Sequence, residues 1–508
     1  MFLDLAVGRL VEPLTGKEWS RSDILRRLVA RRGYYRANGL NSGDRVFIHF
    51  GNSAEFLIEV LALWSAGGCV VPVDPRFTPF EIETLAQWAR PRFSLWEHPP
   101  DNELATSLST LAIELVDLSA IDLDAAPAPG TDNGRSTDLR LDQDALVLFT
   151  SGTTGQPKGV VHTHRSLRAR WMSLRHSLGL ESFQRTLCLL PTHFGHGLIC
   201  NCLFPWLSGQ DLFLLPPFKP DILSRLGAIV DEHRITFLSS VPSVWRLALR
   251  IAPPPRDRTL QRVFIGSAPL SAALWEGVRD WTGTRQVLNA YGITETGSWL
   301  AGTTMPDFSP EDGLVGVPWG GIVRILRNGS PEILFDPDGE CAPGDPGQVW
   351  VHTPALMRGY LDRDDLTAQV VSMGWFATGD IGLRDDRGWL YLRGREREEI
   401  NKGGMKVHPA DIDAVVERFP ATAEVCCFGY PDTLLGEDVG IAVVLLTQDE
   451  ETLRALFAWA TRHLARHQMP QRWFLVEEIP RTSRGKVNRV SVAQRCSTLA
   501  PIDLSALR

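Results

Sequence analysis

The sequence predicts an α/β fold in which a large N-terminal domain is followed by a small C-terminal domain. Apolar β-branched runs alternate with amphipathic helical patterns along most of the chain, which is typical of α/β proteins. The 508 residues correspond to roughly three domain-sized units at about 150 residues each. A charged, glycine-containing stretch near residue 397 precedes a compact run of helix and strand patterns. We therefore expect packed mixed sheets and helices over residues 1–396 and an α+β domain over residues 397–508.

The first predicted elements are buried strands separated by an apolar helix. The run from Val46 to His49 predicts a buried strand, and the following segment FLIEVLALWSAGG predicts a helix that ends at Gly67 and Gly68. The next run, CVVPVDP, predicts a second strand. Residues 125–141 and 336–347 lack periodicity and contain many turn formers, so we expect surface connections there.

A loop rich in glycine and hydroxyl residues lies between two further predicted strands, in the sequence VLFTSGTTGQPKGVVH (residues 147–162). Its glycines allow close approach to a ligand, its successive amides can bind an anion, and Lys158 adds a cation. A Walker A loop, G-x-x-x-x-G-K-[ST], runs into a helix, but here Lys158 follows Pro157 and precedes Gly159. The loop therefore predicts polyphosphate binding by a protein other than an ordinary P-loop NTPase.

Helices and strands are also predicted after this loop and in the C-terminal domain. Apolar residues at offsets 0, 4, 7 and 11 from Leu167 mark one face of a helix. The C-terminal domain should contain the helix PADIDAVVERF, the strands AEVCCFGY and GIAVVLL, and a helix with apolar residues between Leu453 and Leu464.

Composition excludes several classes of protein. The net charge of −8 argues against a protein dedicated to nucleic acid or to an anionic membrane. Asp4 interrupts the N-terminal apolar stretch, so we expect no signal peptide, and no run approaches the roughly 20 apolar residues of a membrane span. The eight cysteines form no C-x-x-C pair. We therefore expect a cytoplasmic protein with reduced thiols, whose oligomeric state the sequence leaves open.

Six ordered motifs resemble those of the adenylate-forming superfamily of acyl-CoA synthetases, adenylation domains and luciferases. They are the loop above, GSAPL (266–270), NAYGITETG (289–297), GWFATGD (374–380), GREREEINKGGMKVHPADID (394–413) and PRTSRGKVNR (480–489). The resemblance covers nearly the whole chain. It implies that ATP and a carboxylic acid react to give acyl-AMP and pyrophosphate, with Mg²⁺ as the metal.

The resemblance also implies roles for individual residues. Lys486 would bridge the carboxylate and the α-phosphate, Thr294 would contact the α-phosphate, and Glu295 would bind Mg²⁺. Asp380 would accept hydrogen bonds from the ribose, and Tyr291 would stack on adenine. The implied nucleotide-binding residues are Thr150, Ser151, Gly152, Thr153, Thr154, Gly155, Lys158, Gly266, Ser267, Ala268, Pro269, Asn289, Ala290, Tyr291, Gly292, Asp380 and Arg395.

The C-terminal domain of this superfamily rotates between adenylation and acyl transfer. The resemblance makes Arg397 the hinge residue, although other members carry Asp or Lys there. Gly403 and Gly404 would line the tunnel for the second nucleophile.

The segment PTHFGHGLICNC (191–202) is implied to form part of the acyl pocket. His193 is a catalytic candidate. Together with Phe194 and His196 it is also a candidate for the gate that closes on the carboxylate. Zinc binding by His193, His196, Cys200 and Cys202 is an alternative, but their spacing matches no common zinc module. The implied pocket residues are Phe194, His196, Ser240, Val241, Gly266 and Ile293. Because the Phe-Asp motif that binds the ammonium of α-amino acids is missing, we expect a plain carboxylic acid.

The acceptor of the acyl group is the most open part of the hypothesis. We expect a thiol, that of coenzyme A, and an amine, as in amide-bond synthetases of the coronafacate-ligase type, is the alternative. A carrier-protein pantetheine is the third candidate, although we expect no carrier domain after Arg508. A nucleotide-binding protein without catalysis is disfavoured by the set of Lys158, Glu295, Asp380 and Lys486.

Overall fold

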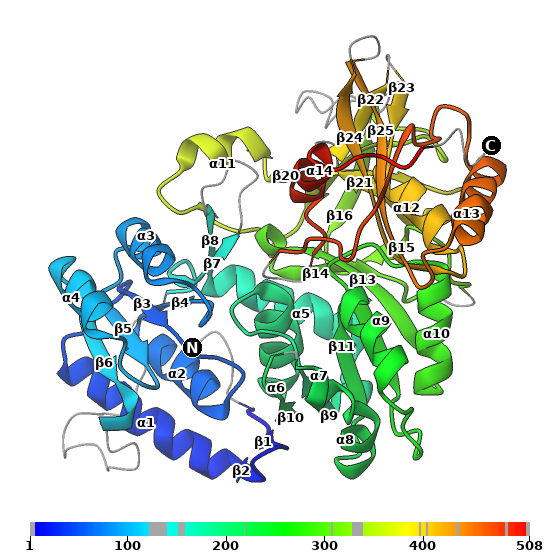
Figure 1. Ribbon diagram of the computed structural model, residues 1–508. Coiled ribbons are helices and arrows are strands. Elements are labelled where there is room, and N and C mark those ends of the chain that lie inside the picture. Colours follow the sequence, from blue (N-terminus) through cyan, green and yellow to red (C-terminus); the bar gives the residue numbers. More distant parts are fainter. Residues whose placement is uncertain are drawn as a thin grey trace.

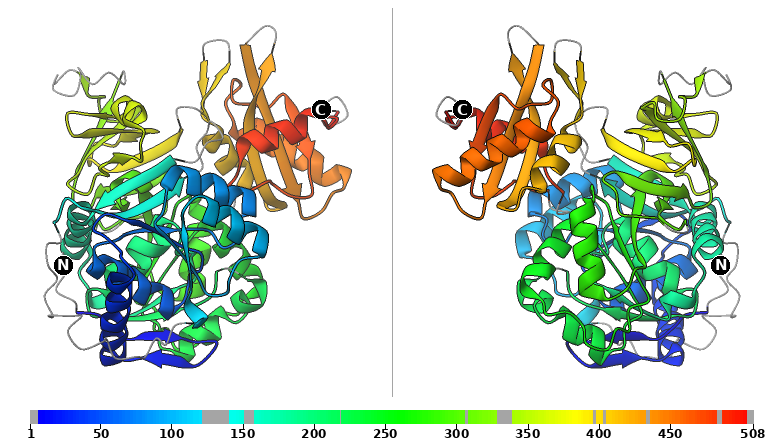
Figure 2. Two further views of the ribbon diagram at one scale, coloured as in Figure 1. Left: turned by 90° about the vertical axis from the view of Figure 1, so that its left-hand side faces the viewer. Right: turned by 90° about the vertical axis from the view of Figure 1, so that its right-hand side faces the viewer.

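The chain folds into a large body and a small C-terminal unit, which confirms the predicted α/β class (Figures 1 and 2). In Figure 1 the C-terminal unit, in orange and red, lies above the part of the body drawn in green. The computed structural model describes residues 6–120, 140–150, 158–217, 219–305, 308–327, 339–395, 398–402, 405–432, 436–482 and 486–503. The connection predicted around residues 125–141 falls almost entirely outside these ranges.

The described strands form three sheets. The first contains β1 (Leu10–Glu12), β2 (Lys17–Trp19), β9 (Arg185–Cys188), β10 (Asp211–Leu214), β11 (Phe237–Ser240), β12 (Arg262–Gly266), β13 (Val287–Ile293), β14 (Ser298–Gly302), β15 (Leu314–Pro318), β16 (Ile322–Leu326), β17 (Gly347–His352), β19 (Val371–Ser372), β20 (Trp375–Arg384) and β21 (Leu390–Arg395). The second contains β3 (Arg45–Ile48), β4 (Cys69–Pro72), β5 (Phe93–Trp96), β6 (Glu114–Asp117), β7 (Asp144–Thr150), β8 (Lys158–Thr163) and β18 (Gly359–Tyr360). The third, in the C-terminal unit, contains β22 (Ile400–Lys402), β23 (Met405–Val407), β24 (Thr422–Asp432), β25 (Gly436–Leu445) and β26 (Arg472–Leu475).

Helices flank these sheets (Figure 1). The α-helices described are α1 (Arg21–Ala37), α2 (Ala54–Ala66), α3 (Pro79–Ala89), α4 (Asn102–Thr110), α5 (His164–Leu178), α6 (Phe204–Trp206), α7 (Pro220–Leu223), α8 (Leu226–Glu232), α9 (Pro242–Ile251), α10 (Ala272–Thr282), α11 (Asp364–Val370), α12 (Pro409–Glu417), α13 (Glu450–His463) and α14 (Arg489–Ser497). Short helical turns occur at η1 (Leu118–Ala120), η2 (Glu181–Phe183) and η4 (Thr294–Thr296), and η3 (His196–Leu203) is a π-helix. None of the described helices combines the length and the apolar character that crossing a bilayer requires.

The parallel part of the first sheet brings several motifs together. Strands β9, β11, β12 and β13 are parallel neighbours, and β13 then pairs with β14 in antiparallel fashion. Because the carboxyl ends of parallel strands share one edge of a sheet, Ser240, Gly266 and Ile293 end their strands at the same edge. This edge forms the floor of the site described below.

The second sheet contains the strands on either side of the phosphate-loop motif. Strands β7 and β8 pair in antiparallel fashion, with Thr150 opposite Lys158, which confirms that the loop joins two strands. The predicted helix before Gly67 is also confirmed as α2. It begins after Ser53, whose hydroxyl caps the amide of Phe56, and it ends where Gly67 adopts a φ of 102°.

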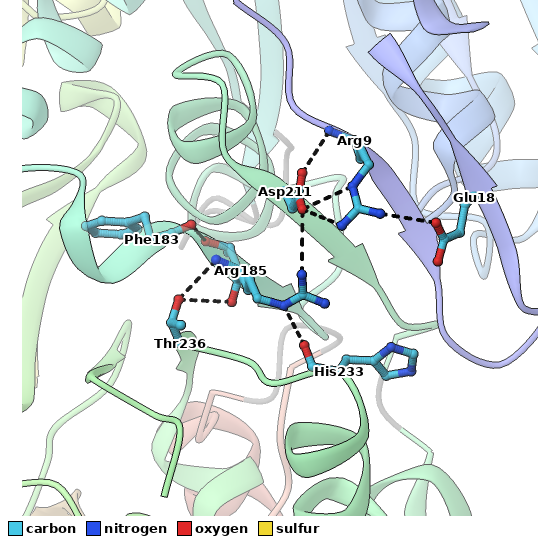
Figure 3. Close-up of polar contacts among 8 residues, drawn as sticks. Arg9, Glu18, Phe183, Arg185, Asp211, His233 and Thr236 are labelled. Carbon is cyan, nitrogen blue, oxygen red and sulfur yellow. Dashed lines mark hydrogen bonds and ion pairs between the residues drawn. The ribbon is translucent and has the colours of Figure 1, made fainter. Parts of the chain in front are cut away.

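Charged side chains link the N-terminal segment that contains β1 and β2 to strands β9 and β10 of the same sheet (Figure 3). Asp211 at the start of β10 accepts two hydrogen bonds from the Arg9 guanidinium, at 2.7 and 3.1 Å. Arg9 also contacts Glu18 of β2 at 3.3 Å, and the guanidinium of Arg185 lies 3.7 Å from Asp211. These contacts therefore hold the N-terminal segment against the large body. The cluster stabilises the fold and is not part of the site.

The C-terminal unit has a core of its own. Strands β24 and β25 form a long antiparallel pair, and β26 runs parallel to β25. Helix α12 buries Ile412 and Val416, and α13 buries Leu456 and Ala460, against this sheet. The predicted helices and strands of this region are therefore confirmed, whereas the boundary at residue 397 stays a prediction because Arg397 lies outside the described residues.

Candidate functional site

A cavity of about 300 Å³ lies between the large body and the C-terminal unit. The body contributes the turn after β12, the end of β13, and residues of β20 and β21, whereas the C-terminal unit contributes α12, β24 and the start of α14. The predicted site residues that line the cavity are Val241, Ser267, Ala268, Pro269, Asn289, Ala290, Tyr291, Gly292, Asp380, Arg395 and Lys486. Five motifs far apart in sequence thus meet in one place.

The turn after β12 depends on a glycine and on a strained serine. A Cβ at Gly266 would lie 2.3 Å from the carbonyl oxygen of Ala290 on the neighbouring strand, so no other residue fits without a shift. Ser267 has a φ of 68°, a conformation that side chains other than glycine rarely adopt. Its hydroxyl lies 2.8 Å from Nδ1 of His196, which helps to hold this conformation. The turn therefore exposes Ala268 and Pro269 to the cavity in a fixed position.

Tyr291, Asp380 and Arg395 form a polar cluster on one wall of the cavity. The Tyr291 hydroxyl donates to one carboxylate oxygen of Asp380, and Arg395 Nε contacts the other at 2.7 Å. Burial raises the pKa of Asp380, while the charge of Arg395 opposes this effect. Burial, with the Asp380 charge as a second cause, raises the pKa of Tyr291 well above its ordinary value. The cluster therefore presents an acceptor-rich carboxylate next to an aromatic ring.

Two buried side chains form hydrogen bonds with the backbone of the turn that carries Thr294 and Glu295. His162 Nε2 lies 2.8 Å from the carbonyl oxygen of Thr294, and burial lowers the pKa of His162 to about 4, which keeps this imidazole neutral. Arg170 donates from Nε and from a terminal nitrogen to the carbonyl oxygen of Thr296, at 3.0 and 2.8 Å. Because His162 lies on β8 and Arg170 on α5, the elements after the loop fix this turn.

The Glu295 side chain is linked to Lys158 through a tyrosine. The hydroxyl of Tyr360, on β18, donates to Glu295 Oε1 at 2.8 Å. The ammonium of Lys158 lies 5.2 Å from the centre of the same aromatic ring. Thr150 lies opposite Lys158 at the end of β7, and its hydroxyl is 3.4 Å from the Lys158 carbonyl oxygen. The body therefore brings a cation and a carboxylate of two different motifs to one tyrosine.

The donor set fits a magnesium ion that is bound mainly through phosphates. No group of three or more His, Cys, Asp or Glu side chains suited to a metal occurs in the part of the chain that the structure describes. Glu295 nevertheless offers a carboxylate with one oxygen bonded to Tyr360. Magnesium is usually held by one or two carboxylates together with substrate phosphates, so the single carboxylate of Glu295 fits such an ion.

His196 lies deep in the predicted acyl pocket between two serines. Its Nδ1 is 2.8 Å from the hydroxyl of Ser267, and its Nε2 is 2.7 Å from the hydroxyl of Ser239. Burial, with a smaller effect from the charge of Lys486, lowers the pKa of His196 to about 3. The imidazole is therefore neutral. The other predicted pocket residues Phe194, Ser240, Val241 and Ile293 are also buried.

His193 makes a different kind of contact. Its Nε2 lies 3.2 Å from the carboxylate of Asp74, which follows β4 and also binds the guanidinium of Arg76 at 2.7 Å. Cys200, in the same segment as His193, accepts a hydrogen bond from the amide of Trp299 at 3.3 Å. Three residues of the alternative zinc site, His193, His196 and Cys200, thus have separate partners in this structure.

Lys486 extends the cavity wall from the C-terminal unit. It is exposed and lines the cavity, and its carbonyl oxygen accepts a hydrogen bond from the amide of Thr482 at 2.7 Å. Its charge is among the causes that lower the pKa of His196 and that oppose the raised pKa of Asp380. The lysine therefore acts electrostatically on two buried groups of the body, His196 and Asp380.

Several predicted residues lie outside the described ranges. They are Ser151, Gly152, Thr153, Thr154 and Gly155 of the loop, the hinge candidate Arg397, and Gly403 and Gly404.

Other residues that contact the site were not predicted from the sequence. These are Asp74, His162, Arg170 and Tyr360. Of these residues only His162 had a local signal in the sequence, because it lies four residues after Lys158 on the strand that follows the loop.

Comparison with protein families supports the reading of the motifs. The family model described as "AMP-binding enzyme" matches residues 16–361, and that described as "AMP-binding enzyme C-terminal domain" matches residues 411–486. Among curated proteins, the oxalate–CoA ligase of Arabidopsis thaliana is 30% identical over 471 residues, which cover 90% of this chain and 89% of the relative. The mitochondrial malonate–CoA ligase of Mus musculus is 30% identical over 486 residues, covering 89% of this chain and 82% of the relative.

Solved structures resemble the whole chain, including its C-terminal unit. The ATP-bound crystal structure of MatB from Rhodopseudomonas palustris superimposes with a TM-score of 0.84 at 26% sequence identity. The match covers 98% of this chain and 97% of that protein. The arrangement of the large body and the small unit is thus one that a nucleotide-bound enzyme also adopts.

Proposed function

The chain belongs to the AMP-binding enzyme family, and we propose that it adenylates a short carboxylic acid and transfers the acyl group to the thiol of coenzyme A. It is an AMP-forming carboxylate ligase, as are the relatives that match over most of its length. The observation that carries the proposal is the cavity shared by Lys486 from the C-terminal unit and by Tyr291 and Asp380 from the body.

The first half-reaction follows from the charges around this cavity. A carboxylate oxygen attacks the α-phosphorus of ATP, the bond to the β-phosphate oxygen breaks, and pyrophosphate leaves. Lys486 reduces the repulsion between the carboxylate and the α-phosphate, and its exposed position allows it to reach both. Asp380 accepts hydrogen bonds from the ribose, and Tyr291 with the Gly266–Pro269 turn holds the adenine. When bound to Glu295 and the phosphates, Mg²⁺ supplies additional positive charge.

In the second half-reaction the coenzyme A thiolate attacks the acyl carbonyl and AMP leaves. We assign Arg397 as the hinge about which residues 397–508 turn between the two steps, and Gly403 and Gly404 to the path of the thiol. The named activities of the relatives, both CoA ligases, support a thiol as the acceptor.

The buried state of the acyl pocket favours a short acid. Trp299, which is 1% exposed, packs edge-on against His196 with 5.6 Å between ring centres. Phe194 and Ile293 are also buried, so a long acyl chain would have to displace well-packed side chains. The neutral His196 and its two serines can instead form hydrogen bonds with a polar group on a small acid. His193 lies beside this pocket and is assigned as its gate.

Mass spectrometry of a single reaction tests this proposal. The mixture contains enzyme, Mg-ATP, a panel of short aliphatic, dicarboxylic and aromatic acids, coenzyme A and a set of amino acids. An acyl-CoA product together with AMP is expected. An N-acyl amino acid that forms equally well without coenzyme A would move the chain to the amide-forming enzymes, and ADP as the nucleotide product would refute adenylation.

A further inference from the structure

The segment before α11 approaches the Glu295 turn through both its backbone and one side chain. The amide of Met357 donates to the carbonyl oxygen of Glu295 at 2.7 Å, and the amide of Leu361 donates to that of Gly159 at 2.7 Å. Tyr360 lies between these two anchors, on a strand paired with β8, and is 6% exposed. Its ring therefore has little freedom to move away from the site.

We propose that Tyr360 is a positioning residue for adenylation, whose hydroxyl fixes the Glu295 carboxylate for the metal and whose ring keeps the Lys158 ammonium apart from that carboxylate. The proposal rests on the metal-binding role of Glu295 given under the proposed function. It concerns a residue that lies outside the six sequence motifs.

The two contacts of Tyr360 have separate consequences. A hydrogen bond to Oε1 would leave Oε2 available to a bound metal ion, and such outer partners orient the ligands of a metal ion. The face of an aromatic ring attracts a cation, so Lys158 has a favourable position that does not involve Glu295. Within the described residues no ion pair joins Lys158 to Glu295 directly. Both charges are thus available to MgATP without first breaking a salt bridge between them.

Isothermal titration calorimetry of ATP, with and without Mg²⁺ and without any carboxylic acid, tests this role. The readout is the ratio of the two dissociation constants, which measures how much the metal strengthens ATP binding and does not depend on turnover or on the acceptor. We expect Tyr360→Phe to reduce this ratio about tenfold, the lower end of the loss seen when a hydrogen-bond partner of a metal ligand is removed. Glu295→Gln should reduce the ratio at least as much. The double variant with Tyr360→Phe should have the same ratio as Glu295→Gln alone.

The ring and the hydroxyl can be separated. Tyr360→Phe retains the ring below Lys158, so its affinity for metal-free ATP should equal that of the wild type, whereas Tyr360→Leu should bind metal-free ATP several-fold more weakly. The matched control is Tyr391→Phe, which removes a tyrosine–glutamate hydrogen bond of 3.1 Å to Glu311. Its ratio should remain that of the wild type.

The possible results separate this inference from its premise. If Tyr360→Phe keeps the wild-type ratio while Glu295→Gln lowers it, the role of the hydroxyl is overturned and Glu295 remains the metal ligand. A wild-type ratio in both variants would refute the metal role of Glu295 and the inference with it. Equal metal-free affinity of the Phe and Leu variants would remove the role of the ring.

Discussion

Arg246 on α9 and Glu417 on α12 form an ion pair that joins the large body to the C-terminal unit. The Nε of Arg246 donates to Glu417 Oε1 at 2.7 Å, and the next residue, Arg418, lies 3.7 Å from Asp312 of the body. The side chains of Arg246 and Glu417 are 27% and 21% exposed, so water screens this pair less than a surface pair. Both residues line the cavity, and their contact stabilises the arrangement in which Lys486 lines the same cavity as Tyr291 and Asp380.

Removal of this pair should slow adenylation more than acyl transfer. We expect Arg246→Gln or Glu417→Gln to reduce pyrophosphate release by about three- to tenfold, in line with the modest energy of a partly exposed ion pair. Thioester formation from chemically prepared acyl-AMP should change by less than about twofold, because that step uses a different arrangement of the C-terminal unit. The exchanged pair Arg246→Glu with Glu417→Arg should recover part of the loss.

A matched control is Arg165→Gln, which removes the exposed ion pair of 2.6 Å with Asp142. This variant should carry out both steps at the wild-type rate. Equal slowing of adenylation and transfer in the Arg246 or Glu417 variants would show that the pair supports folding of the interface and has no preference for one step.

Replacement of Lys486 should separate catalysis from nucleotide binding. In Lys486→Ala the positive charge between acid and α-phosphate is lost, so acyl-AMP formation should fall about 100-fold or more, as for other groups that stabilise developing charge. Affinity for ATP should change by less than about threefold, because Tyr291, Asp380 and the loop still hold the nucleotide. Pyrophosphate release and calorimetric ATP binding measure the two effects. Lys17→Ala, at an exposed lysine of β2, serves as the control. Pyrophosphate release at the wild-type rate would refute the assignment of Lys486.

Replacement of Asp380 should remove recognition of the ribose. Hydrogen bonds to a charged group contribute about 1.5–3 kcal/mol, so Asp380→Asn should weaken ATP binding roughly 10- to 100-fold. The variant should also discriminate less between ATP and its 2′-deoxy and 3′-deoxy analogues. Tyr291→Phe removes one partner of Asp380 but keeps the carboxylate, and should retain the discrimination. If both variants discriminate like the wild type, Asp380 does not contact the ribose.

Local patterns in the sequence were sufficient for much of the fold and for identifying motifs whose residues line one cavity. The loop was predicted to join two strands because apolar runs stand on both sides of it, and β7 and β8 confirm this. The GSAPL, NAYGITETG and GWFATGD motifs lie at strand ends or on strands that reach the cavity. Such motifs are legible because the turn or the ligand restricts their residue types locally.

Contacts between distant segments were beyond reach of the sequence. His162 and Thr294 are 132 residues apart, and Arg170 and Thr296 are 126 apart, so their hydrogen bonds depend on how β8 and α5 lie against the turn between β13 and β14. Tyr360 belongs to a two-residue strand with no periodic pattern. His193 was predicted from its motif, but its contact with Asp74 depends on the second sheet lying beside the first. The side chains that support the site are therefore set by tertiary packing.

Buried histidines should make the protein sensitive to acid, and His49 allows a test outside the site. His49 is stacked on Trp96 with ring centres 3.7 Å apart, and its Nε2 lies 2.8 Å from the hydroxyl of Ser94. Burial lowers the pKa of His49 to about 3, whereas an unfolded histidine titrates near a pKa of about 6.5. Below about pH 6.5 the unfolded chain therefore binds a proton that the folded protein does not, and the free energy of unfolding falls as the pH falls towards 3. Above about pH 6.5 this histidine contributes no pH dependence.

His49→Gln should consequently show a shallower loss of stability on acidification. Glutamine can still form a hydrogen bond with Ser94 but cannot be protonated, so the slope between about pH 6 and pH 4 should decrease by up to about 1.4 kcal/mol per pH unit. Denaturant unfolding at several pH values measures this slope, and the comparison is with the wild type's own slope, so a uniform loss of stability in the variant does not affect it. The remaining slope should come in part from His162 and His196, whose pKa values burial lowers to about 4 and about 3. An unchanged slope in the variant would mean that His49 becomes protonated in the folded protein, and that its stacked position on Trp96 is open to water at acid pH.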